Sequence, residues 1–179
     1  MVLPYFCRMI SLVPLTPADA EMLSKVGGES LLQSHGHSAP AEVMQAYVDN
    51  NFNVEACRAE LSDKTNNFYA VFYNGAPAGY FKTTHHVPHQ LVDTQAVTKL
   101  SRLYVLNQYF NYKLGQPLLH KAIEISKAAG DRGMWLNVWK ENPRAIRFYE
   151  KQGFKIVGES LFVLTETHAN PNWVMLLRY

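Results

Sequence analysis

The stretch WLNVWKENPRAIRFYEKQGFKIVGE, residues 135–159, decides the fold because it joins two apolar runs through a helix with clear start and stop signals. The first run ends at Trp139, and Asn142 and Pro143 then supply an N-cap residue and a proline at the first helical position. Gly153 stands just past the helix end, and Phe154 opens the second run. The stretch therefore predicts a strand over 134–139, a helix over 142–151 and a strand over 154–164.

Upstream, LYVLNQYFNYKLGQPLL (residues 103–119) leads from a strand expected over 97–106 into a helix expected over 116–129. The first turn of such a helix offers free backbone N–H groups and the positive end of the helix dipole, which together suit phosphate groups. Lys113 would add a positive charge. Most strand–loop–helix units bind nothing, so this segment alone leaves a phosphate site and a structural loop both open.

Working outward, Asn74-Gly75 separates two β-rich runs, 68–73 and 79–84, and is a strong hairpin signal. Ser101-Arg102 breaks the alternation of the next strand, which a β-bulge or a tolerated polar position would explain equally. A last strand is expected over 173–177.

The first 60 residues predict a strand over 10–15 and a helix that starts at Thr16-Pro17 and stops at Gly27-Gly28. A loop or broken helix over 30–39 and amphipathic helices over 40–51 and 53–61 follow. Helices, a hairpin, and then alternating strands and helices predict one α/β domain over 1–179, with residues 1–9 as an N-terminal extension.

Bulk composition excludes several classes of protein. The chain has 179 residues, of which 47% are hydrophobic and 18% charged, with a net charge of +2 and no basic stripe, so we expect a globular protein without a nucleic-acid partner. No apolar run is long enough to span a membrane, and no signal peptide is evident, which predicts a cytoplasmic protein. Cys7 and Cys57 do not make a disulfide framework, and Cys57 is expected to be a small buried hydrophobe.

The last 110 residues resemble the GNAT superfamily of N-acetyltransferases. A later family motif falls on Asn142, Ala145, Phe148-Tyr149 and Gly153-Phe154. The earlier motif, Q/R-x-x-G-x-G/A, falls on residues 110–115, where Phe110 replaces Gln or Arg and Lys113 replaces the first Gly. Glycine lets the backbone approach a pyrophosphate closely, and a lysine could follow the same path if its φ stays negative.

The resemblance implies a mixed, mostly antiparallel twisted sheet with a central splayed parallel strand pair and helices on both faces. Acetyl-CoA would be the co-substrate, with its pantetheine arm lying like an extra strand beside Leu103, Tyr104 and Val105. The backbone N–H of Val105 would stabilise the oxyanion of the tetrahedral intermediate. The pyrophosphate would be held by the loop residues Asn111, Tyr112, Lys113, Leu114, Gly115 and Gln116.

The resemblance also implies that Asn142 contacts the pantetheine arm and that Tyr149 protonates the departing thiolate. Each residue has a structural reading as well: Asn142 is explained as an N-cap, Tyr149 as the aromatic face of a short helix, and Leu103 and Val105 as strand core residues.

The general base is unassigned, because residues 98–102 hold no carboxylate where many relatives place a glutamate. His85 and His86 are substitutes by pKa, although the sequence favours solvated loop histidines. His85, His86 and His89 match no standard zinc spacing, so we expect no metal. His35 and His37 are expected in an exposed loop.

Within the superfamily, the chain looks most like the bacterial spermidine/spermine-type N-acetyltransferases. This similarity predicts acetyl transfer to a primary amine of a small molecule, with polyamines among the candidates, by direct attack in a ternary complex. The alternatives are a protein or peptide N-acetyltransferase and a CoA-binding regulatory protein that has lost catalysis. An acid-lined cleft would favour the first and a wide open groove the second. A homodimer is a further expectation from the resemblance.

Overall fold

The computed structural model describes residues 9–179, so Cys7 and all but the last residue of the expected N-terminal extension lie outside the described part of the chain. The strands are β1 (Ile10–Pro14), β2 (Asn66–Tyr73), β3 (Ala76–Thr84), β4 (Val97–Val105), β5 (Gly133–Trp139), β6 (Lys155–Thr165) and β7 (His168–Arg178). The α-helices are α1 (Ala20–His35), α2 (Ala41–Asn51), α3 (Val54–Ser62), α4 (Gly115–Ala128) and α5 (Pro143–Lys151), with short 3₁₀ segments η1 (Pro17–Asp19) and η2 (Asn107–Tyr112).

The strands form one seven-stranded sheet in the order β1-β2-β3-β4-β5-β7-β6. All neighbouring strands are antiparallel except β4 and β5, which are parallel. The predicted mixed, mostly antiparallel sheet of a single α/β domain is therefore confirmed. None of the helices within residues 9–179 is long and apolar enough to cross a lipid bilayer.

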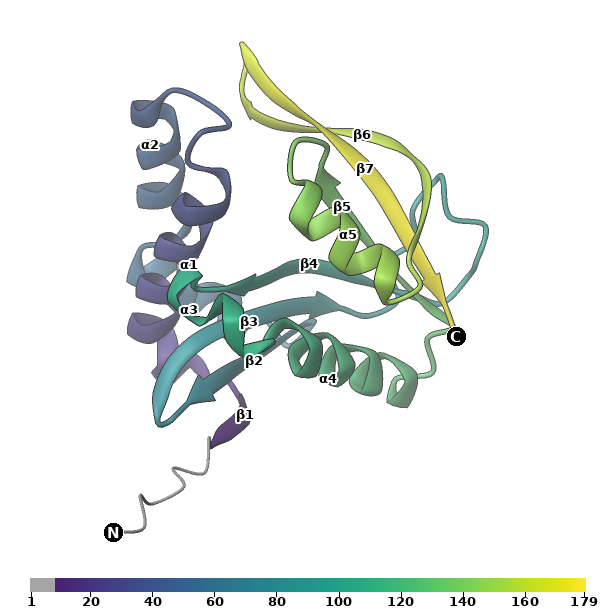
Figure 1. Ribbon diagram of the computed structural model, residues 1–179, viewed down its shortest axis with the longest axis horizontal. Coiled ribbons are helices and arrows are strands. Elements are labelled where there is room, and N and C mark those ends of the chain that lie inside the picture. The colour runs from purple at the N-terminus through teal and green to yellow at the C-terminus, as the bar shows by residue number, and fades with distance from the viewer. Residues whose placement is uncertain (1–8) are drawn as a thin grey trace, which may run out of the picture.

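The parallel pair is splayed. β4 and β5 are in register only from Val97 opposite Gly133 to Lys99 opposite Trp135. Beyond Lys99, β4 pairs only with β3, and β5 continues to pair with β7 up to Trp139. The two strands diverge as a V in Figure 1, with α5 beside its opening, so each presents an unpaired edge to the space between them.

Helices cover both faces of the sheet (Figure 1). One apolar cluster joins α1, α2 and α3 to residues such as Phe68 and Tyr80. A second cluster joins α4 and α5 to residues of the opposite face such as Phe81 and Met175. Alternate β4 residues divide between these layers, so that Tyr104 faces α1 and Leu103 faces α4.

The hairpin prediction is confirmed, and of the two explanations left open for the break at Ser101-Arg102 the structure shows the β-bulge. Asn74 and Gly75 take positive φ values of 50° and 82°, as a type I′ turn requires. The register between β3 and β4 shifts after Lys82, so that Ser101 has no partner, and this is the β-bulge suggested by the break in alternation.

The predicted stop of the first helix at Gly27-Gly28 is wrong, because α1 continues to His35. A Cβ at Gly27 would lie 2.6 Å from Cδ1 of Phe52, and one at Gly28 would lie 3.1 Å from Cγ1 of Val48. The glycines therefore allow α1 to approach its neighbours closely and do not end the helix. The expected loop over 30–39 is for the same reason mostly the last turn and a half of α1.

Candidate active site

A cavity of about 690 Å³ follows the V between β4 and β5 and reaches both helical layers. It brings together most of the predicted site residues: Leu103, Tyr104, Val105, Lys113, Leu114, Gly115, Gln116, Asn142 and Tyr149. Asn111 and Tyr112, the other two loop residues predicted to bind the pyrophosphate, are not part of its lining.

The unpaired edge of β4 directs two backbone N–H groups into the V. Along a strand, successive N–H groups point to opposite sides, and that of Leu106 donates to the carbonyl of Ala78 in β3, at 2.9 Å. The N–H groups of Val105 and Leu103 therefore face away from β3 and toward β5. The free edge suits an extended ligand with amide groups, because such a ligand pairs with it as a strand would.

The loop between β4 and α4 turns through Lys113, whose φ of 57° and ψ of 29° lie in the left-handed region. The negative φ under which a lysine could follow the glycine path is therefore not observed, and Lys113 takes a conformation that favours glycine at a cost of about 1 kcal/mol. α4 begins at Gly115, one residue earlier than predicted, and its N-cap residue Leu114 makes no side-chain capping bond. The helix dipole is thus directed at the cavity without a side-chain cap.

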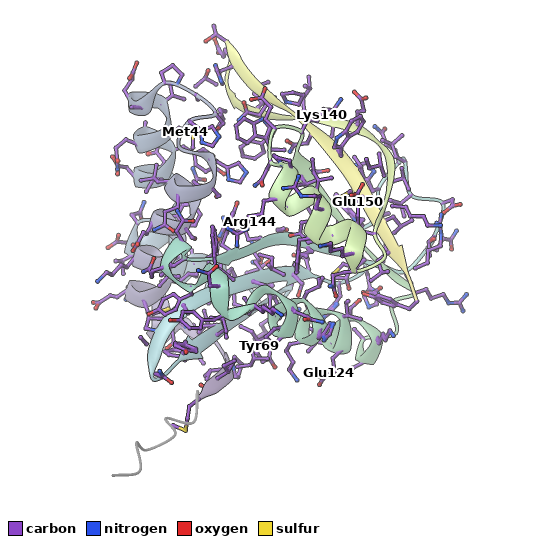
Figure 2. The ribbon with its side chains drawn as sticks, in the orientation of Figure 1. Met44, Tyr69, Glu124, Lys140, Arg144 and Glu150 are labelled. Carbon is purple, nitrogen blue, oxygen red and sulfur yellow. The ribbon has the colours of Figure 1, made fainter. Side chains whose placement is uncertain are left out.

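Arg144 is a site residue that the sequence analysis missed. It lies in the first turn of α5 (Figure 2). Its guanidinium carbon is 3.2 Å from the centroid of the Phe110 ring. Both side chains line the cavity beside the α4 N-terminus. The motif that this loop resembles has Gln or Arg at the position of Phe110, and the stacked Arg144 brings a polar side chain to the same place. Its place directly after Asn142-Pro143 was the signal available in the sequence.

The residues predicted for the acetyl end lie on α5 and at its start. Oδ1 of Asn142 accepts from the backbone N–H of Ala145 at 3.0 Å, so Asn142 is the N-cap of α5 and also lines the cavity. Tyr149 is 8% exposed. Burial, and second the nearby Tyr104, raises its pKa above the ordinary value, which keeps its phenol protonated at neutral pH.

The half of the cavity toward α1 and α2 has a wall of amides, Asn137, Asn170 and Asn172, carried by β5 and β7. Nδ2 of Asn170 donates to Oγ of Ser38 at 2.9 Å, and Nε2 of His168 donates to the carbonyl of Ser38 at 2.8 Å. These bonds join β7 to the α1–α2 turn and close this half of the cavity on one side. Oδ1 of Asn172 is buried and has no hydrogen-bond partner.

His35 lines this same half, so the prediction of an exposed loop histidine is wrong. It is the last residue of α1, and its ring lies 6.0 Å from that of Tyr104 and 5.8 Å from that of Trp139. Burial, and second the neighbouring His37, lowers its pKa to about 4. The imidazole is consequently neutral at pH 7 and is a weak proton acceptor.

The charged side chains that line the cavity are all cations: Lys99, Arg102, Lys113, Arg144 and Lys151. Arg102 is neutralised by Glu60 of α3, since its Nη1 lies 2.6 Å from Oε2 and its Nη2 lies 3.2 Å from Oε1. Lys82 shares the same carboxylate at 2.7 Å. Within residues 9–179, no carboxylate lines the cavity, so the structure offers no acidic general base at its wall.

His85 and His86, the candidate substitutes for that base, do not line the cavity. Nδ1 of His86 is 2.8 Å from Oδ1 of Asp131, and Nδ1 of His85 is 2.9 Å from Oγ1 of Thr98. Asp131 also accepts from the Thr98 hydroxyl, which in turn accepts from Ser126 at 2.7 Å. The histidines belong to a polar network at the paired ends of β4 and β5.

Cys57 is fully buried in the α1–α3 layer and is not part of the cavity lining. Burial raises the pKa of its thiol to about 11, so it is not a thiolate at neutral pH. The expectation of a buried hydrophobe is confirmed.

The cavity suits acetyl-CoA in three respects. The β4 edge offers paired backbone groups for an amide-containing arm, the α4 N-terminus offers a positive dipole end, and Lys113 and Arg144 offer cations for phosphates. A buried, protonated phenol, Tyr149, lines the same space.

The chain is similar to known acetyltransferases. A model of the acetyltransferase (GNAT) family matches residues 29–154. An uncharacterized N-acetyltransferase of Mycobacterium bovis is 29% identical over 88% of this chain and 96% of its own length. A spermidine N(1)-acetyltransferase of Thermoplasma acidophilum is 25% identical over 82% of this chain and 89% of its own length. The crystal structure of the PaiA N-acetyltransferase of T. acidophilum in complex with coenzyme A superposes with a TM-score of 0.77, at 23% identity, over 96% of this chain and 99% of that one.

Proposed function

We propose that this chain, which belongs to the acetyltransferase (GNAT) family, moves the acetyl group of acetyl-CoA to a primary amine of a small molecule by direct attack in a ternary complex. The chain is an N-acetyltransferase, and acetyl-CoA is its co-substrate. The proposal concerns the acceptor, the order of bond changes and the residues that carry them.

The observation that carries the proposal is that one cavity runs through the V from the α4 N-terminus to the amide wall. Two substrates bound from the two helical layers would meet between the edges of β4 and β5. Catalysis by such a site depends mainly on holding amine and thioester in contact, which replaces a bimolecular encounter by a step within one complex.

On the side of α4 and α5, the N–H groups of Leu103 and Val105 would pair with the pantetheine arm. That of Val105 would also stabilise negative charge on the thioester oxygen as the amine attacks. Residues 111–116 would hold the pyrophosphate, with Lys113 and Arg144 as counter-ions. Asn142 would contact the arm with the amide hydrogens that its capping bond leaves free.

The bond changes balance within the complex. The amine nitrogen forms a bond to the thioester carbon, the carbon–sulfur bond breaks, the nitrogen loses one proton and the sulfur gains one. Tyr149 would donate a hydrogen bond, and a proton, toward the departing sulfur, since its raised pKa keeps the phenol protonated.

Direct attack is favoured over an acyl-enzyme because a covalent route needs an activated nucleophile in the site. Cys57, the cysteine within the described residues, is buried away from the cavity and is protonated at neutral pH.

A small acceptor is favoured over a peptide because the acceptor half is bridged. The bonds of His168 and Asn170 to Ser38 tie β7 to the α1–α2 turn, and the rings of Tyr47 and Phe162 lie 5.8 Å apart across the same side. These contacts do not favour a wide, open groove through which a peptide acceptor could pass.

The test is acetyl-CoA turnover with a panel of primary amines, followed by thiol release, on the wild type and on Tyr149→Phe. We expect Tyr149→Phe to lower kcat about a hundredfold and to leave the calorimetric Kd for acetyl-CoA unchanged. Tyr69→Phe is the matched control, since Tyr69 stacks on Phe81 away from the cavity lining. An unchanged kcat in Tyr149→Phe would exclude the acid role, and binding without release with every amine would exclude small-amine transfer.

A further inference from the structure

The acceptor half of the cavity has a charge pattern that selects among amines. Lys99, Ser101, Arg102 and Tyr104 of β4 line it together with the amide wall on β5 and β7. None of the described lining residues is acidic. A polyamine carries several positive charges, and placing them in a partly desolvated space beside lysine and arginine costs electrostatic free energy that no carboxylate there offsets.

Lys99 is the cation of this half that lacks a counter-ion. Arg102 is already paired with Glu60 through two bonds. For Lys99, the contact in the structure is with the ring of Trp135, whose centroid lies 5.2 Å from Nζ, and no ion pair to it occurs within residues 9–179. Half-buried ammonium groups are stable when they are paired, so an anion at this point would be held strongly.

Lys99 is also distant from the phosphate end of the cavity. It is the last β4 residue in register with β5, at the closed end of the V. The α4 N-terminus follows Val105, which is six residues further along β4, or about 20 Å at the rise of a strand. Lys99 lies on the same face as Trp135, whereas the phosphate loop leads into α4 on the opposite face. The phosphates of the co-substrate therefore do not account for it.

Asn172 supplies the second, independent observation. Its side chain is 7% exposed and its Oδ1 has no hydrogen-bond partner, although it lines the cavity. A buried carbonyl oxygen without a donor has lost its hydrogen bonds to water, and a bound amine N–H would replace them. Along the V, Asn172 stands opposite Trp139 near the open end, whereas Lys99 stands opposite Trp135 at the closed end.

From these positions, and resting on the proposed function, we propose that the acceptor is an amine that also carries an anionic oxygen group, with the anion bound by Lys99 and the attacking nitrogen held by Oδ1 of Asn172. A carboxylate or a phosphate would satisfy the same cation. The acceptor lies with its anionic end toward the closed end of the V and its amine toward Leu103 and Val105. A polyamine is excluded by the same charges that hold this anion.

The lowered pKa of Lys99 agrees with an anion bound beside it. Burial, and second the charge of Lys82, lowers the pKa of Lys99 below its ordinary value. A bound anion would reverse both effects by stabilising the ammonium form.

The experiment compares acceptors of one length that differ only at the far end. 5-Aminopentanoate, pentylamine and cadaverine carry an anionic, a neutral and a cationic end, respectively. Shorter and longer amino acids of the same type, and an aminoalkyl phosphonate, then find the preferred spacing and anion. We expect kcat/KM to fall from the anionic to the neutral to the cationic member by about tenfold at each step.

The variants separate the anchor from the fold. Lys99→Met keeps the length of the side chain and should raise KM for the anionic amine about tenfold while leaving pentylamine unchanged. Lys99→Glu should reverse the order, so that cadaverine becomes the better acceptor. Lys155→Met, which removes an exposed cation outside the cavity lining, is the control and should change none of these values. Asn172→Leu should raise KM for all three amines, because it acts on the nitrogen they share.

Each result decides something. Equal losses in Lys99→Met with the anionic and the neutral amine would overturn the anchor role, because they would place Lys99 in the chemistry or the fold. Faster turnover of cadaverine by the wild type would overturn the acceptor class and leave the proposed transfer to small amines intact. Turnover of none of the amines, with acetyl-CoA still bound, would refute the proposed function itself.

Discussion

Replacing Arg144 by alanine is expected to weaken acetyl-CoA binding about tenfold, through loss of a cation held for the phosphates. Arg144 lines the cavity beside Lys113 and the α4 N-terminus, and it is stacked at 3.2 Å on the centroid of the Phe110 ring. The change removes the guanidinium and leaves the helix intact, since alanine suits the first turn of α5.

The magnitude follows from the exposure of the side chain. A hydrogen bond to a charged group is worth about 1.5–3 kcal/mol. Arg144 belongs to the exposed class of residues, so the lower end of that range applies, because water and salt screen the contact. About 1.4 kcal/mol corresponds to a factor of ten in Kd. The Phe110 ring adds pre-orientation, and Phe110→Leu should cost about 0.5–1 kcal/mol on its own, as an exposed cation–π contact does.

The assay is calorimetric titration of acetyl-CoA at low and high salt, with Arg147→Ala as the matched control. Arg147 lies on the same helix and is exposed, but it does not line the cavity. A second arm measures kcat/KM with S-acetylpantetheine, which lacks the phosphates and adenosine. Arg144→Ala should be tenfold weaker with acetyl-CoA at low salt, less so at high salt, and equal to the wild type with S-acetylpantetheine.

Two results would refute this reasoning. If Arg144→Ala bound acetyl-CoA as the wild type does, the guanidinium would serve only the packing of Phe110. If it lost as much activity with S-acetylpantetheine, the residue would act at the pantetheine arm or through the position of α5, and not through a phosphate.

Three further outcomes are expected. Lys113→Gly should raise the melting temperature slightly, because it relieves left-handed backbone strain; the net gain is about 0.5 kcal/mol after the added entropy of glycine in the unfolded chain. Lys113→Ala should not raise it. Both variants should weaken acetyl-CoA binding equally if the ammonium pairs with phosphate. Asp131→Asn should lower the free energy of unfolding in urea by about 3 kcal/mol, because the buried carboxylate joins Thr98 and His86. Asp93→Asn, at an exposed pair, is the control and should leave it nearly unchanged. The pKa of Glu60 is lowered because the attraction of Arg102 and Lys82 outweighs the opposing effect of burial. The stability that the ionised Glu60 gives the fold is therefore present above its ordinary pKa of 4.5 and is lost as pH falls through the folded pKa. Glu60→Gln should be about 1 kcal/mol less stable than the wild type at pH 7, and the two proteins should unfold at the same temperature in acid.

The C-terminal half of the fold was predictable because its signals are local. The ends of α5 are set by hydrogen bonds and dihedral angles of the residues that stand there, Asn142, Pro143 and Gly153. The hairpin turn is set in the same local way by the positive φ angles of Asn74-Gly75. The error at Gly27-Gly28 has the opposite cause. These glycines meet Phe52 and Val48, which lie 20 or more residues away, so their reason for being glycine is tertiary and has no local pattern.

The residues of the candidate site also divide into those that local sequence patterns predict and those that only the tertiary structure brings together. The predicted residues that line the cavity follow family spacing along β4, the loop into α4, and α5 with its N-cap. Lys99, His35 and Asn172 come from three separate elements, and their meeting depends on where β4 leaves β5 and on how α1 continues past its glycines. A lysine on a strand, a histidine near a helix end and an asparagine in a late strand each have ordinary structural readings, so the sequence alone gives no reason to group them.

The charges around the acceptor, and not a single basic residue, explain how the acceptor amine could lose its proton in this site. An acceptor ammonium must lose a proton before it attacks, and many enzymes use a carboxylate for this. Arg102, which lines the acceptor half, belongs to a cluster with Glu60 and Lys82 that carries more positive than negative charge, and His35, which lines the same half, is weakly basic. A positive environment lowers the pKa of a bound ammonium, so the amine can give its proton to water before attack. In the proposed complex the bound anion would neutralise Lys99, so the charge that lowers the pKa of the amine would be that of the Arg102–Glu60–Lys82 cluster.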